Sequence, residues 1–209
     1  ETVDPLSGLA GDLSALKPAG QGLIIGCHAF GNDVATTQTA LPLARLLSKA
    51  GSTVYVDLSG ARAETEQAVG HYMARGVTDI LAGVASFGEC IHRDRASRMH
   101  VIPAGESGFD PAESLAGEAF SAVVEALAQT YDYVLLDAGP LGTIIDDSMR
   151  QTGAVILVSS RDDSDPAVAR VFQRLDAVRP GCVTIVVDEP SLPPPRAAND
   201  RTAQRHTAA

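Results

Sequence analysis

The sequence predicts an α/β fold in which a doubly wound, mostly parallel sheet carries helices on both faces. Short apolar segments rich in valine, isoleucine and leucine alternate with helical patterns along the chain. Within each short segment the apolar residues follow one another almost without interruption, which is typical of strands buried on both faces. The chain has 209 residues, of which 45% are hydrophobic, so it can bury one sizeable core.

Strands and helices are expected to alternate along the chain. The expected strands occupy residues 22–27, 53–58, 99–103, 133–137, 154–159 and 183–187. The helical patterns occupy residues 37–50, 63–75, 111–129 and 166–178, and residues 77–92 predict two short helical turns joined at Gly83. Gly51 and Gly76 are expected to end two of the helices, and Pro166 to begin the last one.

Three parts are expected along the chain. Residues 20–189 form the α/β domain, residues 1–19 form an N-terminal segment, and residues 190–209, with three consecutive prolines, are expected to be a disordered tail. The sequence begins at Glu1 rather than methionine, which is expected of a piece of a longer protein, with room for a membrane segment upstream.

Charge and cysteine content exclude several classes of protein. The net charge of -10 gives an acidic surface that repels a phosphate backbone, so no nucleic-acid partner is expected. The three cysteines, Cys27, Cys90 and Cys182, are far apart and are expected to be reduced thiols of a cytoplasmic protein. No apolar run approaches the roughly 20 residues that span a bilayer, so this segment is not expected to insert into a membrane.

Residues 23–47, LIIGCHAFGNDVATTQTALPLARLL, have the outline of a phosphate-binding loop between a strand and a helix. Such a loop combines glycines, a lysine that reaches the outer phosphates, and a hydroxyl that holds Mg²⁺. Thr37 falls at the hydroxyl position, Thr36 at the lysine position and Ala35 at the preceding glycine, and Gly31 lies near the start. The pattern predicts a P-loop NTPase-like fold with Gly31, Thr36 and Thr37 as candidate nucleotide-binding residues.

The missing lysine has no obvious replacement nearby in sequence. The chain has two lysines, of which Lys49 lies about 18 Å beyond the loop at about 1.5 Å per helical residue. Arg45 is on the same helix, and only His28 places a titratable cation in the loop. A helix N-terminus attracts anions by itself, so weak binding of Mg-ATP or Mg-ADP is one interpretation. A capped turn without a ligand is the other.

Two charged segments have structural and functional interpretations. The acids of RDDSDP, residues 161–166, have the composition of a metal site, as do Asp146 and Asp147, but we expect RDDSDP to cap the helix that begins at Pro166. The segment HRDRASR, residues 92–98, suits an acidic neighbour or a phosphate, but a solvated loop is favoured.

Three further segments carry a family resemblance. They are GSTVYVDLSGAR at 51–62, GVTDILAGVASFGECIHRDRASRMHVIPAGE at 76–106 and TYDYVLLDAGPLGTIIDD at 130–147. Together they resemble the cytoplasmic ATPase domain of bacterial tyrosine kinases and polysaccharide co-polymerases, which control the chain length and export of capsular and extracellular polysaccharides. The resemblance is collinear over residues 20–188 and most specific at 76–106.

The resemblance implies roles for particular residues. Asp57 and Asp137 match acidic positions at the ends of two strands, and Ser59 replaces a further family aspartate. In active relatives these acids and the loop hydroxyl, here Thr37, arrange Mg²⁺ and the attacking hydroxyl for phosphoryl transfer. Asp57 and Asp137 are thus candidate catalytic residues and, with Thr37, candidate magnesium ligands. A structural role for each acid, capping a neighbouring turn, is the alternative.

The departures from the family determine the predicted function. The tail lacks the family's tyrosines, and DPLSGLAGDLSALKPAG does not match its E-x-x-R-x-x-R assembly helix. We therefore expect a degenerate, inactive tyrosine-kinase-like adaptor or regulator of exopolysaccharide biosynthesis and export, at the inner face of the bacterial inner membrane. Its partner would be a membrane co-polymerase or another export protein, and a homo-oligomer is left open. The alternatives are an active ATPase or tyrosine kinase whose cation comes in trans, and a pseudo-ATPase that positions pili or cell-pole proteins.

Overall fold

The computed structural model describes residues 5–31, 35–72, 74–106, 117–141, 151–161, 164–178 and 183–187. The strands in these ranges are β1 (Leu23–Ala29), β2 (Thr53–Asp57), β3 (His92–Arg93), β4 (His100–Ile102), β5 (Tyr133–Pro140), β6 (Ala154–Ser159) and β7 (Val183–Val187). The helices are α1 (Pro5–Ala15), α2 (Thr37–Leu47), α3 (Arg62–Val69), α4 (Val77–Leu81), α5 (Phe87–Cys90), α7 (Glu118–Thr130) and α9 (Pro166–Val178).

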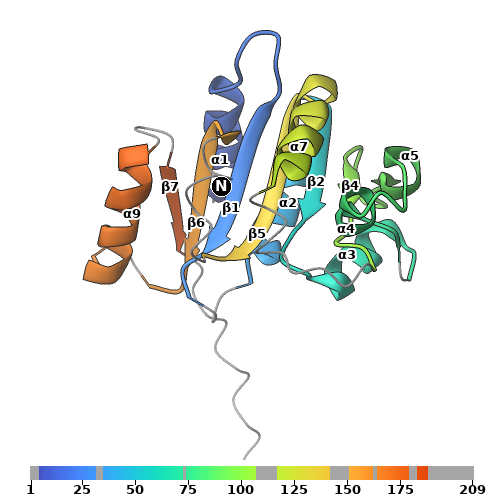
Figure 1. Ribbon diagram of the computed structural model, residues 1–209. Helices are drawn as coiled ribbons and strands as arrows, with labels where there is room; N and C mark the ends of the chain where they lie inside the picture. Colours follow the sequence, from blue (N-terminus) through green and yellow to red (C-terminus); the bar gives the residue numbers. More distant parts are fainter. Residues whose placement is uncertain are drawn as a thin grey trace, which may run out of the picture.

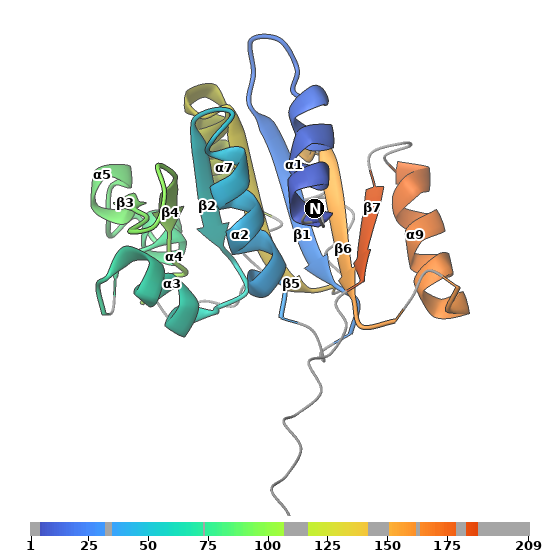
Figure 2. The ribbon, with the colours of Figure 1, turned by 180° about the vertical axis from the view of Figure 1, so that it is seen from behind.

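The strands form one sheet in the order β3-β4-β2-β5-β1-β6-β7 (Figure 1). Every described pairing is parallel except that of β3 with β4. The helices α1 and α2 cover one face, as Figure 2 shows, and α7 lies on the other. The predicted doubly wound, mostly parallel α/β fold is confirmed.

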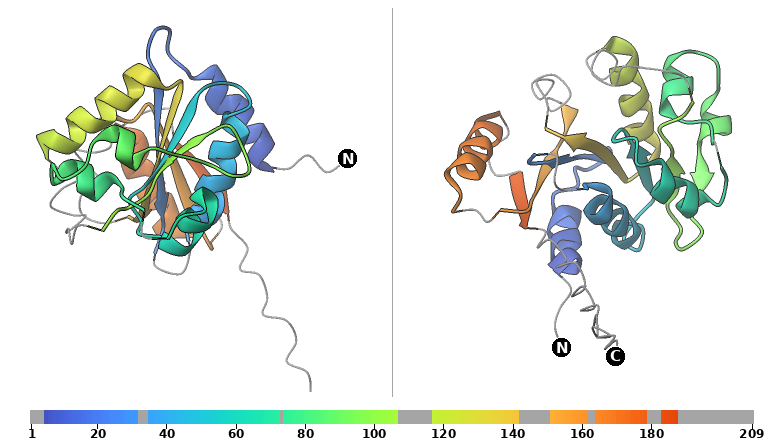
Figure 3. Two further views of the ribbon diagram at one scale, coloured as in Figure 1. Left: turned by 90° about the vertical axis from the view of Figure 1, so that its right-hand side faces the viewer. Right: turned by 90° about the horizontal axis from the view of Figure 1, so that it is seen from below.

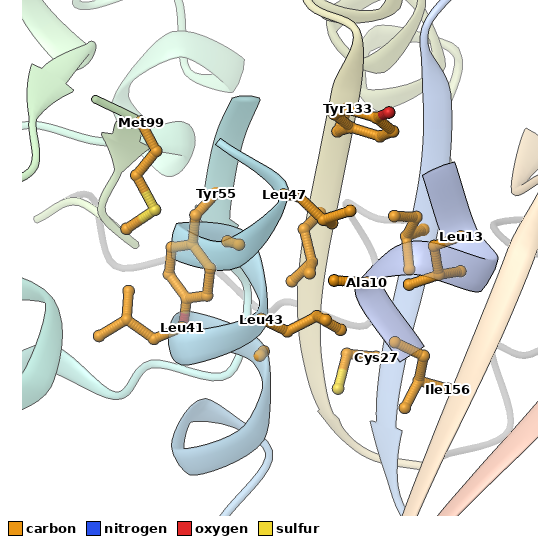
Figure 4. Packing of buried hydrophobic residues seen from close by; sticks show 14 of the residues in the cluster. Ala10, Leu13, Cys27, Leu41, Leu43, Leu47, Tyr55, Met99, Tyr133 and Ile156 are labelled. Atoms are coloured by element: carbon orange, nitrogen blue, oxygen red, sulfur yellow. The ribbon is translucent and has the colours of Figure 1, made fainter. Parts of the chain in front are cut away.

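Both faces of the central strand β1 are buried, as its continuous hydrophobicity predicted. Ile25 and Cys27 pack with α2 in one apolar cluster, and Ile24 packs with α7 in another. Successive side chains of a strand point to opposite faces, so one apolar strand supplies both layers. Figure 4 shows the first layer, where Leu43 and Leu47 of α2 lie over the sheet.

The two lateral edges of the sheet differ. At the β7 edge, Val168 and Leu175 of α9 pack against Val155 and Leu157 of β6. At the β3 edge lie α3, α4 and α5, and the right-hand view of Figure 3 shows them at the opposite end of the row of strands from α9. The candidate site described below lies between these edges, where β1, β2 and β5 end.

The predicted helix 63–75 is wrong in its second half. Helix α3 ends at Val69, because Gly70 adopts a left-handed conformation with φ +75° and its amide donates to the Glu66 carbonyl at 2.7 Å. Gly76, the expected helix end, instead precedes α4, and its amide donates to Asp79 Oδ2 at 2.9 Å. The helical pattern did not distinguish a glycine that ends one helix, Gly70, from a glycine that precedes the next, Gly76.

Other boundaries agree with the sequence more closely. The two short helices α4 and α5 are present, with Gly83 at φ +70° between them. Helix α2 ends at Leu47, and a turn continues to Gly51, whose amide donates to the Leu47 carbonyl. The helix expected at 111–129 is described from Glu118 to Thr130, and residues 107–116 lie outside the described ranges.

Helix α1 lies within the expected N-terminal segment, where no helix was predicted. Ala10 and Leu13 are buried in the same cluster as Leu47, and Figure 4 shows them beside β1 and β6. Lys17, just after the helix, pairs with Asp132 at 2.9 Å. This pair and the Ser52 hydroxyl and amide lower the pKa of Asp132 to about 2.

The segment 92–98 anchors α2. Asp94 is 5% exposed and accepts from Arg45 Nε at 3.1 Å and Nη2 at 2.8 Å. Arg98 donates to the carbonyl of Ser48 at 2.8 Å, just beyond the end of α2. The interpretation of a solvated loop is therefore wrong for Asp94, whereas Arg93, Arg95 and Arg98 are exposed.

The remaining expectations have mixed outcomes. Asp165 Oδ1 accepts from the Ala167 amide at 2.7 Å, which confirms that this acid caps α9. Cys27 and Cys90 are buried free thiols. Asp146, Asp147, Asp162, Asp163, Cys182 and the tail 190–209 lie outside the described ranges. In the part of the chain that is described, no helix is both long and apolar enough to cross a membrane.

Candidate nucleotide site

Two fully buried carboxylates lie side by side at the carboxyl edge of the sheet. Asp57 and Asp137 are register partners at the ends of β2 and β5, and both are 0% exposed. Parallel strands present their carboxyl ends at one edge, and this is where α/β sheets bind ligands. The start of α2 lies at the same edge, so strand topology brings together residues about 100 positions apart in sequence.

Asp137 is surrounded by hydroxyl groups. Its Oδ1 accepts a short hydrogen bond from Thr36. Its Oδ2 accepts from three hydroxyls, Thr37 at 2.5 Å, Tyr55 at 2.6 Å and Ser59 at 3.3 Å. A buried carboxylate is stable only when such donors replace water. Thr36 and Thr37, the candidate ligand-binding residues of the loop, are thus engaged with the candidate catalytic acid.

Asp57 is held by its own loop. Its Oδ1 accepts from the Ser59 hydroxyl at 3.0 Å and from the Gly60 amide at 2.9 Å, and its Oδ2 accepts from Thr65 at 3.1 Å. Burial and the charge of Asp137 raise the pKa of Asp57, and these hydrogen bonds oppose the rise. Ser59, at the position of the family's further aspartate, lies within hydrogen-bond distance of both carboxylates, which share its single hydroxyl proton.

Tyr55 belongs to this site and was missed in the sequence. It is 0% exposed, and burial together with the charges of Asp137 and Asp57 raises its pKa well above the ordinary value, so it remains a neutral donor. Its place in an apolar strand predicted a core residue. Its spacing from Asp57 could have indicated its place in the site, because residues two apart in a strand point to the same face and Tyr55 precedes Asp57 by two.

Gly31 lies at the start of the loop with φ +89°, a backbone conformation that favours glycine. Residues 32–34 fall outside the described ranges. The amide of Phe30 donates to the Val158 carbonyl at 2.7 Å, which holds the strand before the loop against β6.

The structure changes the expectation about cations. His28 is 7% exposed, and burial lowers its pKa to about 4, so it carries no positive charge at neutral pH. Arg161, which follows β6, was not considered as a loop cation. Its guanidinium carbon lies 5.7 Å from the ring centroid of Phe30, one residue before Gly31, and it pairs with Asp165 at 3.2 Å. Its position could have been predicted, because Arg161 follows a strand that pairs in parallel with the strand before the loop.

Magnesium fits the chemistry of this site. Carboxylate and hydroxyl oxygens are the ligands that Mg²⁺ prefers, and Thr37, Asp57 and Asp137 supply them. The raised pKa of Asp57 reflects burial and a neighbouring negative charge, both of which a cation would offset. Within the described ranges, this site included, no group of three or more histidine, cysteine or acidic side chains is arranged to hold a metal, and the site offers two acids and one hydroxyl.

No protein-family model matches the chain. Among curated proteins it is 31% identical over 123 residues to the tyrosine-protein kinase CpsD of Streptococcus agalactiae, which covers 56% of this chain and 51% of CpsD. It is 25% identical over 131 residues to the tyrosine-protein kinase wzc of Salmonella typhi, over 61% of this chain and 18% of wzc. The chain thus spans about half the length of CpsD and less than a fifth of wzc.

Solved structures show the same fold. The VpsO kinase domain superposes with a TM-score of 0.72 at 21% identity, over 87% of this chain and 93% of that domain. The kinase domain of the Escherichia coli tyrosine kinase ETK gives 0.71 at 17% identity, over 98% and 78%. A complex of Cyanothece McdA with ATP gives 0.60 at 17% identity, over 79% and 70%. Sequence and fold together identify the chain as a relative of the bacterial tyrosine kinases, built on the P-loop fold of their kinase domains.

Proposed function

We propose that this chain is a degenerate, catalytically inactive relative of the tyrosine kinases that acts as an adaptor or regulator in exopolysaccharide biosynthesis and export. The observation that carries the proposal is the hydrogen bond from Thr36 to Asp137. A lysine at that position would reach outward to phosphates. Thr36 instead is 2% exposed and directs its hydroxyl inward to a carboxylate.

The electrostatics of the site support the same conclusion. Asp57 and Asp137 place carboxylates at this edge, and a triphosphate adds more negative charge. Active phosphoryl-transfer sites balance such charge with a lysine and a metal ion. Lys17 pairs with Asp132 and Arg45 with Asp94, so neither balances the charge of this site. Nucleotide affinity should be weak for this reason.

Bound Mg²⁺ would be held by Thr37, Asp57 and Asp137, and it would supply charge stabilisation to phosphate oxygens. To serve as a ligand, the Thr37 oxygen would turn a lone pair to the ion while its O–H continues to donate to Asp137 Oδ2. Tyr55 and Ser59 would continue to fix the Asp137 carboxylate. These residues therefore organise a site that keeps two acids, Asp57 and Asp137, but lacks the lysine of a phosphate-binding loop.

The proposed partner is a membrane polysaccharide co-polymerase or another export protein, with the chain at the inner face of the bacterial inner membrane. Relatives named tyrosine-protein kinase CpsD and wzc, and the fold shared with the chimerical protein CapA2B2 at a TM-score of 0.71, support this setting. The acidic net charge of -10 disfavours nucleic acid as the partner.

Isothermal titration calorimetry with Mg-ATP and Mg-ADP tests the proposal. Wild type is compared with Thr37→Ala, and Thr39→Ala serves as the matched control because Thr39 is a buried threonine of the same helix. We expect no saturating heat up to millimolar nucleotide. Saturation in the micromolar range that Thr37→Ala abolishes and Thr39→Ala preserves would contradict the degenerate interpretation.

A second candidate function, an active ATPase or kinase, is favoured by Arg161. Its guanidinium lies over Phe30 at the carboxyl edge of the sheet, where a cation could face a bound phosphate. Under this candidate, Arg161→Ala abolishes ATP hydrolysis, and Arg170→Ala, an exposed arginine of α9, leaves it unchanged. Absence of hydrolysis in the wild type, alone and with a partner protein, would exclude it.

A further inference from the structure

The four tyrosines of the chain differ sharply in exposure. Tyr55, Tyr131 and Tyr133 are 0%, 8% and 3% exposed, whereas Tyr72 is 83% exposed. All four lie within the described ranges. Tyr72 is therefore the one tyrosine that another protein can reach in the folded chain.

Two of the buried tyrosines also have engaged hydroxyls. Tyr55 donates to Asp137 at 2.6 Å. The Tyr131 hydroxyl lies 2.7 Å from Nδ1 of His100. Modification of either residue would require the sheet to open, so neither competes with Tyr72 as an acceptor.

The turn that carries Tyr72 rests against the β3 edge of the sheet. Gly70 ends α3 in the left-handed conformation, and a Cβ there would lie 2.8 Å from Cδ of Arg95. The Arg95 amide donates to the Ala68 carbonyl at 2.9 Å. The rings of His71 and His92 lie 6.2 Å apart between centroids. Tyr72 thus follows a turn packed on the segment that bears Arg93 and Arg95.

These two arginines are free to take an anion. Both are exposed, and neither forms an ion pair with a carboxylate in the described ranges. Other arginines nearby are occupied, since Arg75 pairs with Glu89 at 3.3 Å and Arg98 donates to the Ser48 carbonyl. Two exposed arginines that form no ion pair in the described ranges therefore lie on the segment that packs against the turn before Tyr72.

We propose that Tyr72 is a phosphorylation site for a tyrosine kinase, and that Arg95, with Arg93, binds the phosphate and fixes the turn after α3 to the β3 edge. The inference rests on the proposed regulatory function within a tyrosine-kinase system. A phosphotyrosine carries roughly -1.5 to -2 charges at neutral pH, and arginine matches its oxygens with paired donors.

The phosphoryl donor is ATP bound with Mg²⁺ by the modifying kinase. The phenolic oxygen of Tyr72 attacks the γ-phosphorus, and a new O–P bond forms. The bond from that phosphorus to the oxygen bridging to the β-phosphate breaks, and ADP leaves with the electron pair. The phenolic proton passes to a carboxylate base of the modifying kinase and then to solvent.

The experiment incubates the chain with Mg-ATP, alone and with the VpsO kinase domain first verified on a glutamate–tyrosine copolymer, and maps phosphate by mass spectrometry. We expect phosphate on Tyr72 with the added kinase, and none on a Tyr72→Phe chain. Absence of phosphate on Tyr72 in both arms, or equal incorporation in Tyr72→Phe, overturns the proposal. Phosphate on Tyr72 without added kinase supports the site but contradicts catalytic inactivity, so the two proposals fail separately.

A second measurement tests the arginine contact. The phosphate of phospho-Tyr72 is titrated by ³¹P NMR in wild type, in Arg95→Gln and in Arg170→Gln as the matched control. A nearby guanidinium lowers the pKa of a phosphate, which is ordinarily about 6. We expect a lower pKa in wild type and Arg170→Gln than in Arg95→Gln. Equal values in all three chains would overturn the assigned role of Arg95.

Discussion

The Thr36 hydroxyl donates to Asp137 Oδ1 across 101 residues of sequence and links the start of α2 to the end of β5. Thr36→Val removes this donor and leaves a buried carboxylate oxygen short of a partner. We expect the free energy of unfolding to fall by about 1–3 kcal/mol, measured by urea denaturation. Thr36→Ser keeps the hydroxyl and should recover most of the loss. Equal stability of Thr36→Val and wild type would contradict the role assigned to this bond.

Restoring the loop chemistry should restore nucleotide binding. The double change Ala35→Gly and Thr36→Lys supplies the missing backbone freedom and cation. One charge-assisted contact is worth about 1.5–3 kcal/mol, so we expect Mg-ATP to bind about ten- to a hundredfold more tightly in calorimetry. Gln38→Lys, an exposed position on the same helix, adds the same charge outside the loop and serves as the control.

An unchanged affinity in the double variant would show that the missing lysine is not what limits binding. An equal gain in Gln38→Lys would point instead to the general charge of the surface. Either result would remove the main physical reason for calling the loop degenerate.

The raised pKa of Asp57 predicts a pH dependence of stability. Its ordinary value is 3.8, and burial together with the charge of Asp137 raises it in the folded chain. The native state therefore favours the protonated acid, and the stability this gives is complete below 3.8 and lost as pH rises through the folded pKa. We expect wild type to gain stability relative to Asp57→Asn as the pH falls from neutral toward that value.

Urea denaturation of both chains at a series of pH values provides the measurement. Asp57→Asn is the appropriate reference because its amide oxygen can still accept from the Gly60 and Ala61 amides. A difference in stability that is constant with pH, or that changes in the opposite direction, would show that Asp57 titrates normally.

The ion pair of Arg45 and Asp94 should contribute more to stability than an exposed pair. The Asp94 side chain is 0% exposed and that of Arg45 is 33% exposed, so Arg45→Met leaves a buried carboxylate without its cation. We expect a loss of about 3 kcal/mol, partly recovered by adding Asp94→Asn. Arg75→Met breaks the exposed pair with Glu89 and should cost less than about 1 kcal/mol. Thermal unfolding that ranks the two single changes equally would contradict this assignment.

Much of the fold could be predicted because a strand that is buried on both faces has an almost continuous run of apolar residues in the sequence. The strands Ala154–Ser159 and Val183–Val187 agree with their predicted bounds. Helix α1 was missed because its glycines and serines give little helical pattern, and its two buried residues gain their partners only in three dimensions. Strand β3, of two residues, is too short to leave any pattern.

The residues of the candidate site were likewise predicted only in part. Thr36 and Thr37 were proposed from the loop pattern, and Asp57 and Asp137 from strand ends that match the family resemblance; the structure places these four side by side. Tyr55 was missed because a buried tyrosine and an apolar core residue look alike in sequence. Arg161 was missed because nearness to the loop was judged along the chain, whereas strand order sets it across the sheet.

The strand order also decides when the protein can fold during its own synthesis. Both neighbours of β1 are late in the chain, since β1 pairs with β5 from Tyr133 and with β6 from Ala154 (Figure 1). A nascent chain that has emerged only as far as β4 therefore holds β1, which is buried at every position in the folded protein, without either partner. Such non-local pairing is slow, and until it is complete, hydrophobic surface and unpaired strand edges stay exposed and prone to aggregation. The sheet therefore closes around β1 only after β6 has been synthesised, and until then we expect chaperones to protect the exposed strand.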